Sequence, residues 1–529
     1  MPKSLAFFLL SLVICSSCAR KNFFQESALT IPAEKTAIAS GNTPDSVTVT
    51  VGRHYDKGFF QTFLFGKHYR KLWATPVKLP VYDMGEAKGG LTPVSMGGGF
   101  QTTSLTLKDK AGRQFVLRSL DKDPEKTLPP GLRHTFLLNV IRDQTSAANP
   151  FAPLVLPHLS RAAGIYYTSP DFYYVAENDS TMGKHAPRVN GKVMMLEEKF
   201  EGKKNLIPMF GNAVDLVDSE DLLEERYADS RHRIDQQFFA RNRLFDVLIG
   251  DWDRHEGQWQ WAVYKNGNNF IYKPIAKDRD QTFYRFNDGV ITWLASKLPF
   301  LKKFQTFHHH YGNMSGWLFN AEFIDARALN EVTRQQWQQQ AQSMKAAITD
   351  TVIENAIARF PQPIYEKNGE QTIRRLKSRR DKLPEAAEAI YEILAKKVTV
   401  AGTDQKEKFM VERLPSGDTR VRVYSLENKS ETPFYERLFI RKETKEITLH
   451  GLRGDDEFEI SGEAPKAIKL KVFGGPGEDE LTDTSNVKGW CKKTHVYDTR
   501  RGIEVVGGPE TKKKLTWDVA VHAYDYEGI

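Results

Sequence analysis

Acidic side chains occur in two short segments of the chain that could carry phosphoryl-transfer chemistry. Asp253 stands five residues before the amide Gln258, and Asp278 and Asp280 follow the second strand of an expected hairpin. Phosphoryl transfer needs a carboxylate near the acceptor hydroxyl and further acidic groups that bind the metal of the nucleotide. A kinase catalytic loop has the same spacing between its catalytic Asp and its metal-binding Asn. The two segments therefore supply candidates for both kinds of group.

With Asp251 as a fourth acid, carboxylates flank this hairpin on both sides. They would repel one another unless a cation or arginines neutralised them, and we interpret the cluster as a metal or polyphosphate site. Arg254 and His255 are interpreted as structural residues that brace the loop through hydrogen bonds, because a kinase-type mechanism needs only the acid of this tripeptide.

A glycine cluster and a basic strand residue could form a phosphate cradle. Gly97, Gly98 and Gly99 precede two segments of alternating apolar residues that predict a β-hairpin, and Arg118 follows the apolar residues of the second. The plain alternatives are a flexible turn for the glycines and a surface position for Arg118. Glu197, which follows a short buried strand over 193–196, is a further candidate for the nucleotide site.

These candidates must be positioned by the elements around them. Apolar residues at three- and four-residue spacing predict a helix over 233–250, which points the chain at Asp251. Residues 259–275 predict a hairpin that turns at Asn266-Gly267. Helical spacing returns over 321–359 and 370–397.

The segment from Phe245 to His255, together with Asp278 to Phe283, resembles the core of the spore-coat CotH kinases. It is similar, more loosely, to secretory-pathway Fam20 kinases and to phosphoinositide kinases, all of which place an Asp-Arg-His tripeptide in the catalytic loop. It also resembles a domain of bacterial cell-envelope lipoproteins in which such a core precedes β structure. The match is strong over about 50 residues. It implies a two-lobed, protein-kinase-like domain that binds ATP or another nucleotide with Mg²⁺ or Mn²⁺.

Position by position, the resemblance implies that Asp253 orients or deprotonates the acceptor and that Gln258 is the second metal-loop ligand. Asp278 or Asp280 would be the main metal ligand, and the three glycines would form the nucleotide lid. Arg118 falls where these families carry the phosphate-binding Lys, whose charge it keeps but not its geometry. Gln258 stands where Asn or Glu is usual. The candidates for the acidic or amide partner of the cation are Asp143 and Gln144.

Two alternatives to an active kinase follow from the same residues. Arg118 and Gln258 favour a catalytically inactive pseudokinase or scaffold that keeps the fold. Asp278 to Thr282 also satisfies the Asp-x-Asp-x-Thr pattern of haloacid-dehalogenase-type phosphatases, in which the first Asp is phosphorylated. Those enzymes continue with alternating helices and strands of a parallel sheet, whereas here mostly helix follows.

The first 17 residues have the layout of a lipoprotein signal peptide. Lys3 precedes an apolar run from Leu5 to Ile14, too short to span a membrane, and small residues lead to Cys18. This resembles a lipobox, with Cys15 where Leu is usual, and makes Cys18 the candidate for lipidation. Cleavage without lipidation is the alternative. The implied protein is exported and lipid-anchored in the bacterial cell envelope, at the outer membrane, with an unknown protein or envelope substrate.

Length and composition predict more than one folded unit. The chain has 529 residues, 27% of them charged, and its net charge of +8 is spread along the sequence, which does not predict nucleic-acid binding. Residues 18–46 are rich in small and polar residues and predict a flexible tether. We expect an α+β kinase-like domain over 47–398, with lobes at 47–202 and 203–398, and an all-β domain over 399–529.

Within this β domain, residues 451–458 and 474–481 share a Gly-x-x-Gly-x-Asp-x-apolar frame 23 residues apart. The second copy resembles the calcium-binding nonapeptide of β-roll proteins, so bound Ca²⁺ is a less favoured alternative. Two copies are too few for such a roll. We therefore expect two successive coils or hairpin turns that reuse one tight glycine corner.

Overall fold

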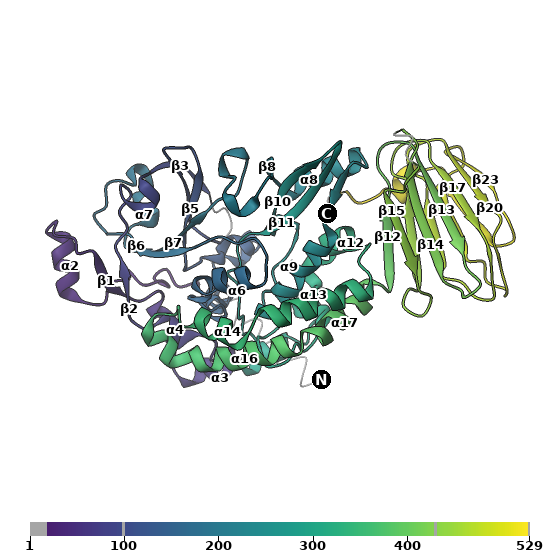
Figure 1. The fold of residues 1–529 in the computed structure, drawn as a ribbon. Coiled ribbons are helices and arrows are strands. Elements are labelled where there is room, and N and C mark those ends of the chain that lie inside the picture. Colours follow the sequence, from purple (N-terminus) through teal and green to yellow (C-terminus); the bar gives the residue numbers. More distant parts are fainter. Residues whose placement is uncertain (1–17, 98–100, 428–430, 527–529) are drawn as a thin grey trace.

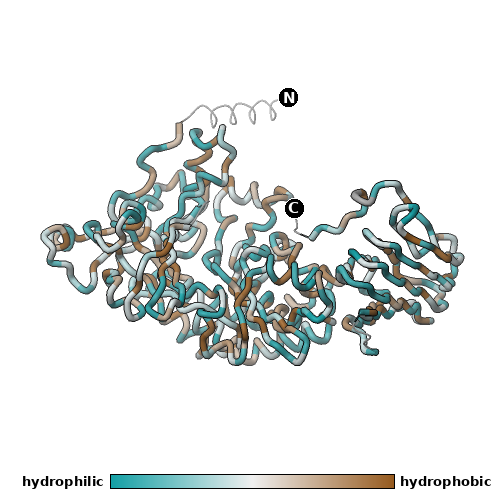
Figure 2. Tube along the Cα trace, turned by 90° about the horizontal axis from the view of Figure 1, so that it is seen from above, coloured by the Kyte–Doolittle hydropathy of each residue, from teal (hydrophilic) through white to brown (hydrophobic). Residues whose placement is uncertain are grey.

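The computed structural model describes residues 18–97, 101–427 and 431–526. Figure 1 shows a part of mixed helices and strands, which extends to helix α17 (Leu383–Leu394), and a part built of strands that begins at β12 (Lys397–Ala401) and projects from one end. The expectation of an α+β unit followed by an all-β unit is confirmed. In Figure 2 strongly hydrophobic stretches lie inside the mixed part.

A five-stranded antiparallel sheet forms one side of the mixed part. The expected hairpin is present as β4 and β5, and its alternating apolar side chains, among them Leu105 and Leu117, are fully buried. Gly97 ends β3, whereas Gly98 and Gly99 lie outside the described residues. In spatial order the strands are β3 (Leu91–Gly97), β4 (Ser104–Asp109), β5 (Gln114–Ser119), β7 (Val193–Glu198) and β6 (Asp171–Tyr174).

Helix α9 (Gln236–Ile249) lies at the centre of the helical region and leads into the candidate catalytic loop. It begins three residues later than expected, because residues 232–234 form strand β9 and Asp235 caps the helix by accepting a hydrogen bond from the Phe238 N–H. It ends at Gly250, whose φ of 73° suits glycine and turns the chain sharply. The helices around it include α12 (Glu322–Ala328), α13 (Arg334–Ala347), α14 (Asp350–Ile357) and α16 (Glu370–Asp381).

A second, four-stranded sheet places both acidic segments at one of its ends. Strand β10 (Trp259–Asn266) starts directly after Gln258, and β11 (Asn269–Ala276) ends directly before Lys277. The two strands pair as the expected hairpin, with Asn266 opposite Asn269, so the tight turn is Gly267-Asn268, one residue later than expected. Strand β8 (Asp215–Asp218) flanks β10, and β9 (His232–Ile234) flanks β11.

The segment after Cys18 differs from the flexible tether that its composition indicated. Phe23, Leu29 and Ile38 are buried in the main hydrophobic core, and residues 32–39 form helix α2. These apolar side chains are too irregularly spaced to reveal a strand or a long helix, yet they give the segment enough surface to bury. The expected signal peptide over 1–17 lies outside the described residues.

The strand-built part is a parallel β-helix in which each turn of chain lies on the one before. Register between coils is regular, with Glu446 opposite Lys469 and Glu457 opposite Glu480, a step of 23 residues in each case. One face consists of β12, β16 (Glu446–His450), β19 (Lys469–Phe473), β22 (Thr494–Thr499) and β24 (Thr511–Thr516). The other has β13 (Glu407–Arg413), β17 (Glu457–Ser461), β20 (Asp479–Asp483) and β23 (Ile503–Val506), with β14 (Thr419–Ser425) and β15 (Tyr435–Phe439) added antiparallel at its edge.

The repeated glycine frame forms the same corner in two successive coils of this β-helix. Of the two expected arrangements, successive coils and hairpin turns, the structure has the coils. Gly451 and Gly474 lie directly against the buried carboxyl groups of Asp456 and Asp479, so a side chain at either glycine would displace an acid.

The β-helix is attached to the helical region by polar contacts and by the end of the chain. Asn330 donates a hydrogen bond to the Thr399 carbonyl over 2.9 Å, and Arg334 pairs with Glu443 at 3.0 Å. The chain then returns from the β-helix, and Tyr524 packs edge-on against Tyr227 (Figure 1).

Among the described residues, no helix is both long and apolar enough to span a bilayer.

Candidate active site

The candidate catalytic acid lies in the loop that follows α9. Asp253 is half-buried, and its Oδ1 accepts a hydrogen bond of 2.8 Å from the Asn320 side chain. Its backbone N–H donates to the fully buried Asp251, over 3.1 Å. Asn320 therefore orients the Asp253 carboxylate, and Asp251 holds its backbone, as positioning an acceptor hydroxyl would require.

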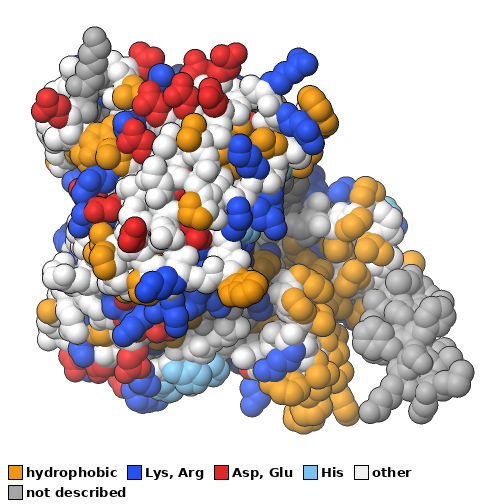
Figure 3. All heavy atoms as spheres, turned by 90° about the vertical axis from the view of Figure 1, so that its right-hand side faces the viewer, with side chains coloured by type: hydrophobic (Ala, Val, Ile, Leu, Met, Phe, Trp, Pro, Cys, Tyr) orange, Lys and Arg blue, Asp and Glu red, His pale blue; other side chains and the backbone are white. Residues whose placement is uncertain are grey.

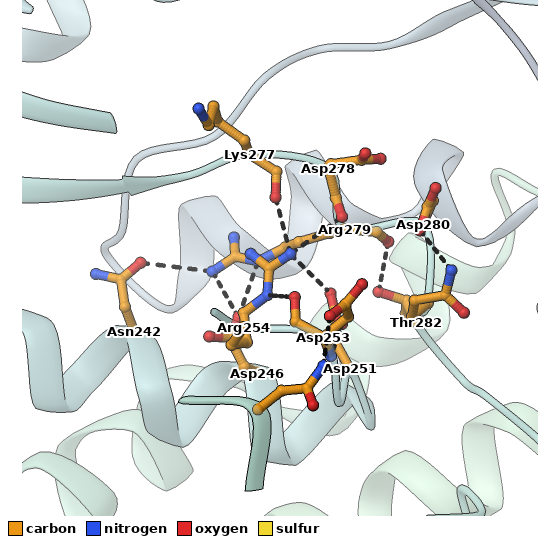
Figure 4. A network of polar contacts seen from close by, with 12 residues as sticks. Asn242, Asp246, Asp251, Asp253, Arg254, Lys277, Asp278, Arg279, Asp280 and Thr282 are labelled. Atoms are coloured by element: carbon orange, nitrogen blue, oxygen red, sulfur yellow. Dashed lines mark hydrogen bonds and ion pairs between the residues drawn. The ribbon is translucent and has the colours of Figure 1, made fainter. Parts of the chain in front are cut away.

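Arg254 joins this loop to the second acidic segment (Figure 4). Its guanidinium is fully buried and donates to the carbonyls of Asp253, Lys277 and Asp278 at 2.9, 2.9 and 3.0 Å. His255 is partly exposed, and its Nδ1 accepts a hydrogen bond from the Gly257 N–H at 3.2 Å. Arg254 thus braces the loop as expected, whereas His255 makes only local contacts at the surface.

A set of buried ion pairs connects the second acidic segment to helices α9 and α12. Arg279, between the two candidate metal ligands in sequence, points away from them and pairs with Asp246 of α9 at 3.0 Å. Asp246 also contacts Arg243, which pairs with Asp325 of α12 at 2.8 Å. The alternation of Asp278, Arg279 and Asp280 thus places acids on one side of the segment and a basic anchor on the other.

Asp278 and Asp280 each meet a cation from the five-stranded sheet. Arg118 on β5 lies 2.9 Å from the Asp278 carboxylate, and Lys122, just beyond β5, forms an ion pair with Asp280. Burial alone would raise the pKa of Asp278, but Arg118 and Lys122 outweigh it and the pKa falls well below its usual range. Burial and the charge of Asp278 raise the pKa of Asp280.

Arg118 has a different partner from those expected. Its Nε lies 3.1 Å from Glu197 on the neighbouring strand β7, and Glu197 also accepts a hydrogen bond from Thr168. Asp143 instead makes a bidentate ion pair with Arg70, and Gln144 contacts His68. The cation and its acid therefore come from adjacent strands of one sheet rather than from a strand and the following helix.

The structure brings together most of the residues that the sequence singled out. Glu197, Asp278 and Asp280 line one small pocket, whose apolar wall includes Leu156 and Met195. Gln258 is half-buried, and its carbonyl accepts a hydrogen bond from the Lys277 N–H at 3.0 Å, which places it beside Asp278. Of the glycines, only Gly97 is described; it ends β3 and lies opposite Ser104 of β4, which in turn lies opposite Arg118 of β5.

Two residues of the site were not found from the sequence. Lys122 lies past the end of the β5 strand pattern, although its spacing of four from Arg118 was a usable clue. Asn320 contacts Asp253 across 67 residues of chain, and no local pattern indicates such a contact.

The donor set can be tested for a divalent cation. The Oδ1 atom of Asp278 is buried and has no hydrogen-bonding partner, so one carboxylate oxygen is available to a metal. Neither at this site nor elsewhere in the described residues do three side chains of the types His, Cys, Asp and Glu converge in a way that could hold a metal ion. Arg118 and Lys122 provide the neutralising charge in this conformation.

No family model matches the chain, and no curated protein matches it. Among solved structures it is similar to the Helicobacter pylori proinflammatory kinase CtkA, at 14% identity and a TM-score of 0.29, over 54% of this chain and 94% of that one. It is also similar to a structure of the Shewanella oneidensis MR-1 toxin–antitoxin system HipA and HipB with operator DNA, at 10% identity and a TM-score of 0.23, over 59% of this chain and 77% of that one.

Proposed function

We propose that the mixed part of the chain binds a nucleoside triphosphate with Mg²⁺ or Mn²⁺ and transfers phosphate to a protein or envelope acceptor. One observation carries the proposal: Arg118 and Lys122 of the five-stranded sheet contact Asp278 and Asp280 of the helical part. Cations from one side and carboxylates from the other thus meet where a polyphosphate and its metal would be held.

In this proposal each residue has a role that its position supports. Arg118 and Lys122 bind phosphate oxygens, and Glu197 keeps Arg118 oriented when Asp278 is engaged elsewhere. Asp278, with Asp280 and Gln258 beside it, would hold the cation, which when bound neutralises charge on the phosphates. Asp253, oriented by Asn320, accepts the proton of the acceptor hydroxyl or orients it.

The contacts also support a second candidate, a scaffold that binds nucleotide without transferring phosphate. Both site cations are already paired with the acids, so the site is electrostatically satisfied without any ligand. The phosphatase alternative has less support, because strand β11 before Asp278 pairs antiparallel with β10. In addition, Thr282 is buried and donates its hydroxyl to the Arg279 carbonyl.

Thermal unfolding of the chain from residue 18 onward, with ATP, GTP or ADP and either cation, tests the ligand assignment. We expect a nucleotide with Mn²⁺ to raise the melting temperature by several degrees, because binding to the folded state alone stabilises it. Asp278→Asn should remove the metal-dependent part of the rise. Asp56→Asn, which alters an exposed pair with Lys71, is the matched control.

Transfer is tested separately, with radiolabelled γ-phosphate and cell-envelope extract as acceptor. Labelling that Asp253→Asn abolishes, with the nucleotide-induced melting shift intact, supports a kinase. A melting shift without labelling supports the scaffold. The absence of a shift with any nucleotide would contradict nucleotide binding, and with it both candidate functions.

We also propose that the protein is exported and lipid-anchored through Cys18. This thiol is exposed and free at the first described residue of the chain, which leaves it open to modification. Metabolic labelling with radioactive palmitate should mark the protein, and Cys18→Ser should abolish the label. A labelled Cys18→Ser protein, or an unlabelled native one, contradicts the anchor.

A further inference from the structure

Two short segments far apart in the sequence form one exposed apolar patch on the mixed part. Nine of the eighteen large hydrophobic side chains that are exposed among the described residues belong to it. Phe60 is 80% exposed, Phe300 61% and Trp293 50%. We call this the apolar patch, and its members are Phe59, Phe60 and Phe63 of α3 (Phe59–Phe65), Val290, Ile291, Trp293 and Leu294 of α10 (Val290–Ala295), and Leu298 and Phe300.

The two helices of the apolar patch are held together as a unit. Gly289, before α10, approaches the backbone of Phe65 and Gly66 so closely that any side chain there would clash. His68 donates its backbone N–H to Asp288 at 2.7 Å, and its ring lies 2.6 Å from the same carboxylate. Because the support is rigid, the exposure is not the result of a loose loop.

The two segments that carry the apolar patch contain basic residues and no acids of their own, and the acids directly before them, Asp56 and Asp288, pair with Lys71 and His68. Neither residues 57–82 nor residues 289–321 contain Asp or Glu. The exposed Lys297 places its ammonium nitrogen 5.2 Å from the centre of the Trp293 ring, a cation–π contact at the surface. Lys67 is also exposed beside α3. Figure 3 shows hydrophobic side chains gathered at the lower right of the face that it draws, with basic side chains next to them and acidic ones at the lower left.

We propose that the apolar patch inserts into the interface of an anionic lipid bilayer. Protruding Phe, Trp and Leu side chains on segments whose own charged residues are all basic are the chemistry of interfacial helices, in which apolar groups enter the headgroup boundary and ammonium groups meet lipid phosphates. The interface between two copies of a protein, by contrast, usually has both signs of charge at its rim.

The start of the described chain lies near the same patch. Phe23 packs against Lys57, with the ammonium 5.6 Å from the ring centre, and Lys57 stands two residues before α3. Five residues separate Phe23 from Cys18, so Cys18 lies within about 18 Å of Phe23 along the chain. A chain end that reached the membrane at Cys18 would bring the apolar patch close to the same surface.

Vesicle flotation tests the proposal with the chain from residue 18 onward carrying Cys18→Ser, so that no lipid can be attached. The vesicles are phosphatidylcholine alone, or with about a third phosphatidylglycerol. We expect binding to the anionic vesicles, and a loss of about tenfold or more in the double variant Phe60→Ser/Trp293→Ser. The matched control is Trp490→Ser/Trp517→Ser, which removes two exposed tryptophans of the β-helix part.

Melting temperature shows that the variants are folded, since exposed substitutions change stability little. Lys67→Gln/Lys297→Gln should weaken binding to anionic vesicles and leave binding to neutral ones unchanged. The proposal is overturned if the starting protein does not float, or if the patch variant floats as well as the control. It is also overturned if ultracentrifugation shows a dimer that Phe60→Ser/Trp293→Ser dissociates while vesicle binding persists.

Discussion

Arg118 and Asp278 lie 2.9 Å apart, and this ion pair joins the five-stranded sheet to the acidic segment after β11. The same guanidinium contacts Glu197, so one cation is shared by the buried Glu197 and the partly buried Asp278. The pair shows how the chain neutralises, without a ligand, acids that would otherwise repel one another. It also identifies the contact that a bound metal and polyphosphate would have to replace.

Arg118→Met should therefore destabilise the protein and make it responsive to metal. Removing one partner leaves buried carboxylates uncompensated, which costs about 3–5 kcal/mol. A divalent cation can supply the missing charge, so Mn²⁺ should raise the melting temperature of Arg118→Met more than that of the native chain. Arg113→Met, whose ion pair with Asp109 is partly exposed, is the control. An equal Mn²⁺ response in all three proteins would contradict the assignment.

Arg254→Met should have a large effect on stability, whereas His255→Ala beside it should have little. The Arg254 guanidinium donates hydrogen bonds to three backbone carbonyls in the interior. Removing this charged donor should lower the free energy of unfolding by about 3–5 kcal/mol. His255 makes one local contact at the surface, so its loss should cost about 0.5 kcal/mol or less. Urea unfolding of the two variants measures the difference. Similar midpoints for both would show that Arg254 does not brace the site.

The local elements of the site were predictable, but the contacts between them were not. Helix α9 and the β10–β11 hairpin follow from apolar spacing and from a Gly-containing turn, which depend on neighbouring residues only. The pairing of Arg118 with Glu197 requires β5 and β7 to be neighbours, and nothing in either strand specifies that. The sequence favoured Asp143 as the partner of Arg118, but Asp143 forms an ion pair with Arg70 instead.

The β-helix shows the same limit. An all-β unit was expected and the 23-residue frame indicated repeated corners, but parallel stacking joins strands that are never consecutive. The segment after Cys18 shows the opposite error, because polar composition concealed Phe23, Leu29 and Ile38, which pack against residues far along the chain.

Gly474→Ala should destabilise the β-helix part. A methyl group at this position would fall on the carboxyl groups of Asp479 and Asp498, which have no room to move in the packed coil. Overpacking of this kind costs about 1–3 kcal/mol. Gly131→Ala is the control, because no atom lies within 4 Å of the added methyl there. Chemical denaturation followed by far-ultraviolet circular dichroism compares them, and equal midpoints would contradict the packing described.

The buried acids of the β-helix should make its stability fall as pH rises. Burial and neighbouring carboxylates raise the pKa of Asp456 to about 10 and that of Asp479 to about 8, whereas an unfolded Asp has a pKa of about 3.9. Between these values the folded state holds more protons than the unfolded state, so the free energy of unfolding decreases with increasing pH. Asp456→Asn should flatten this dependence and raise the melting temperature at pH 9, because a neutral amide replaces a carboxyl group that ionises at a cost. Glu504→Gln, which changes an exposed acid on β23 of the same part, should leave the profile unchanged. A native profile that is flat or rising from pH 5 to pH 9 would show that these acids are not held protonated.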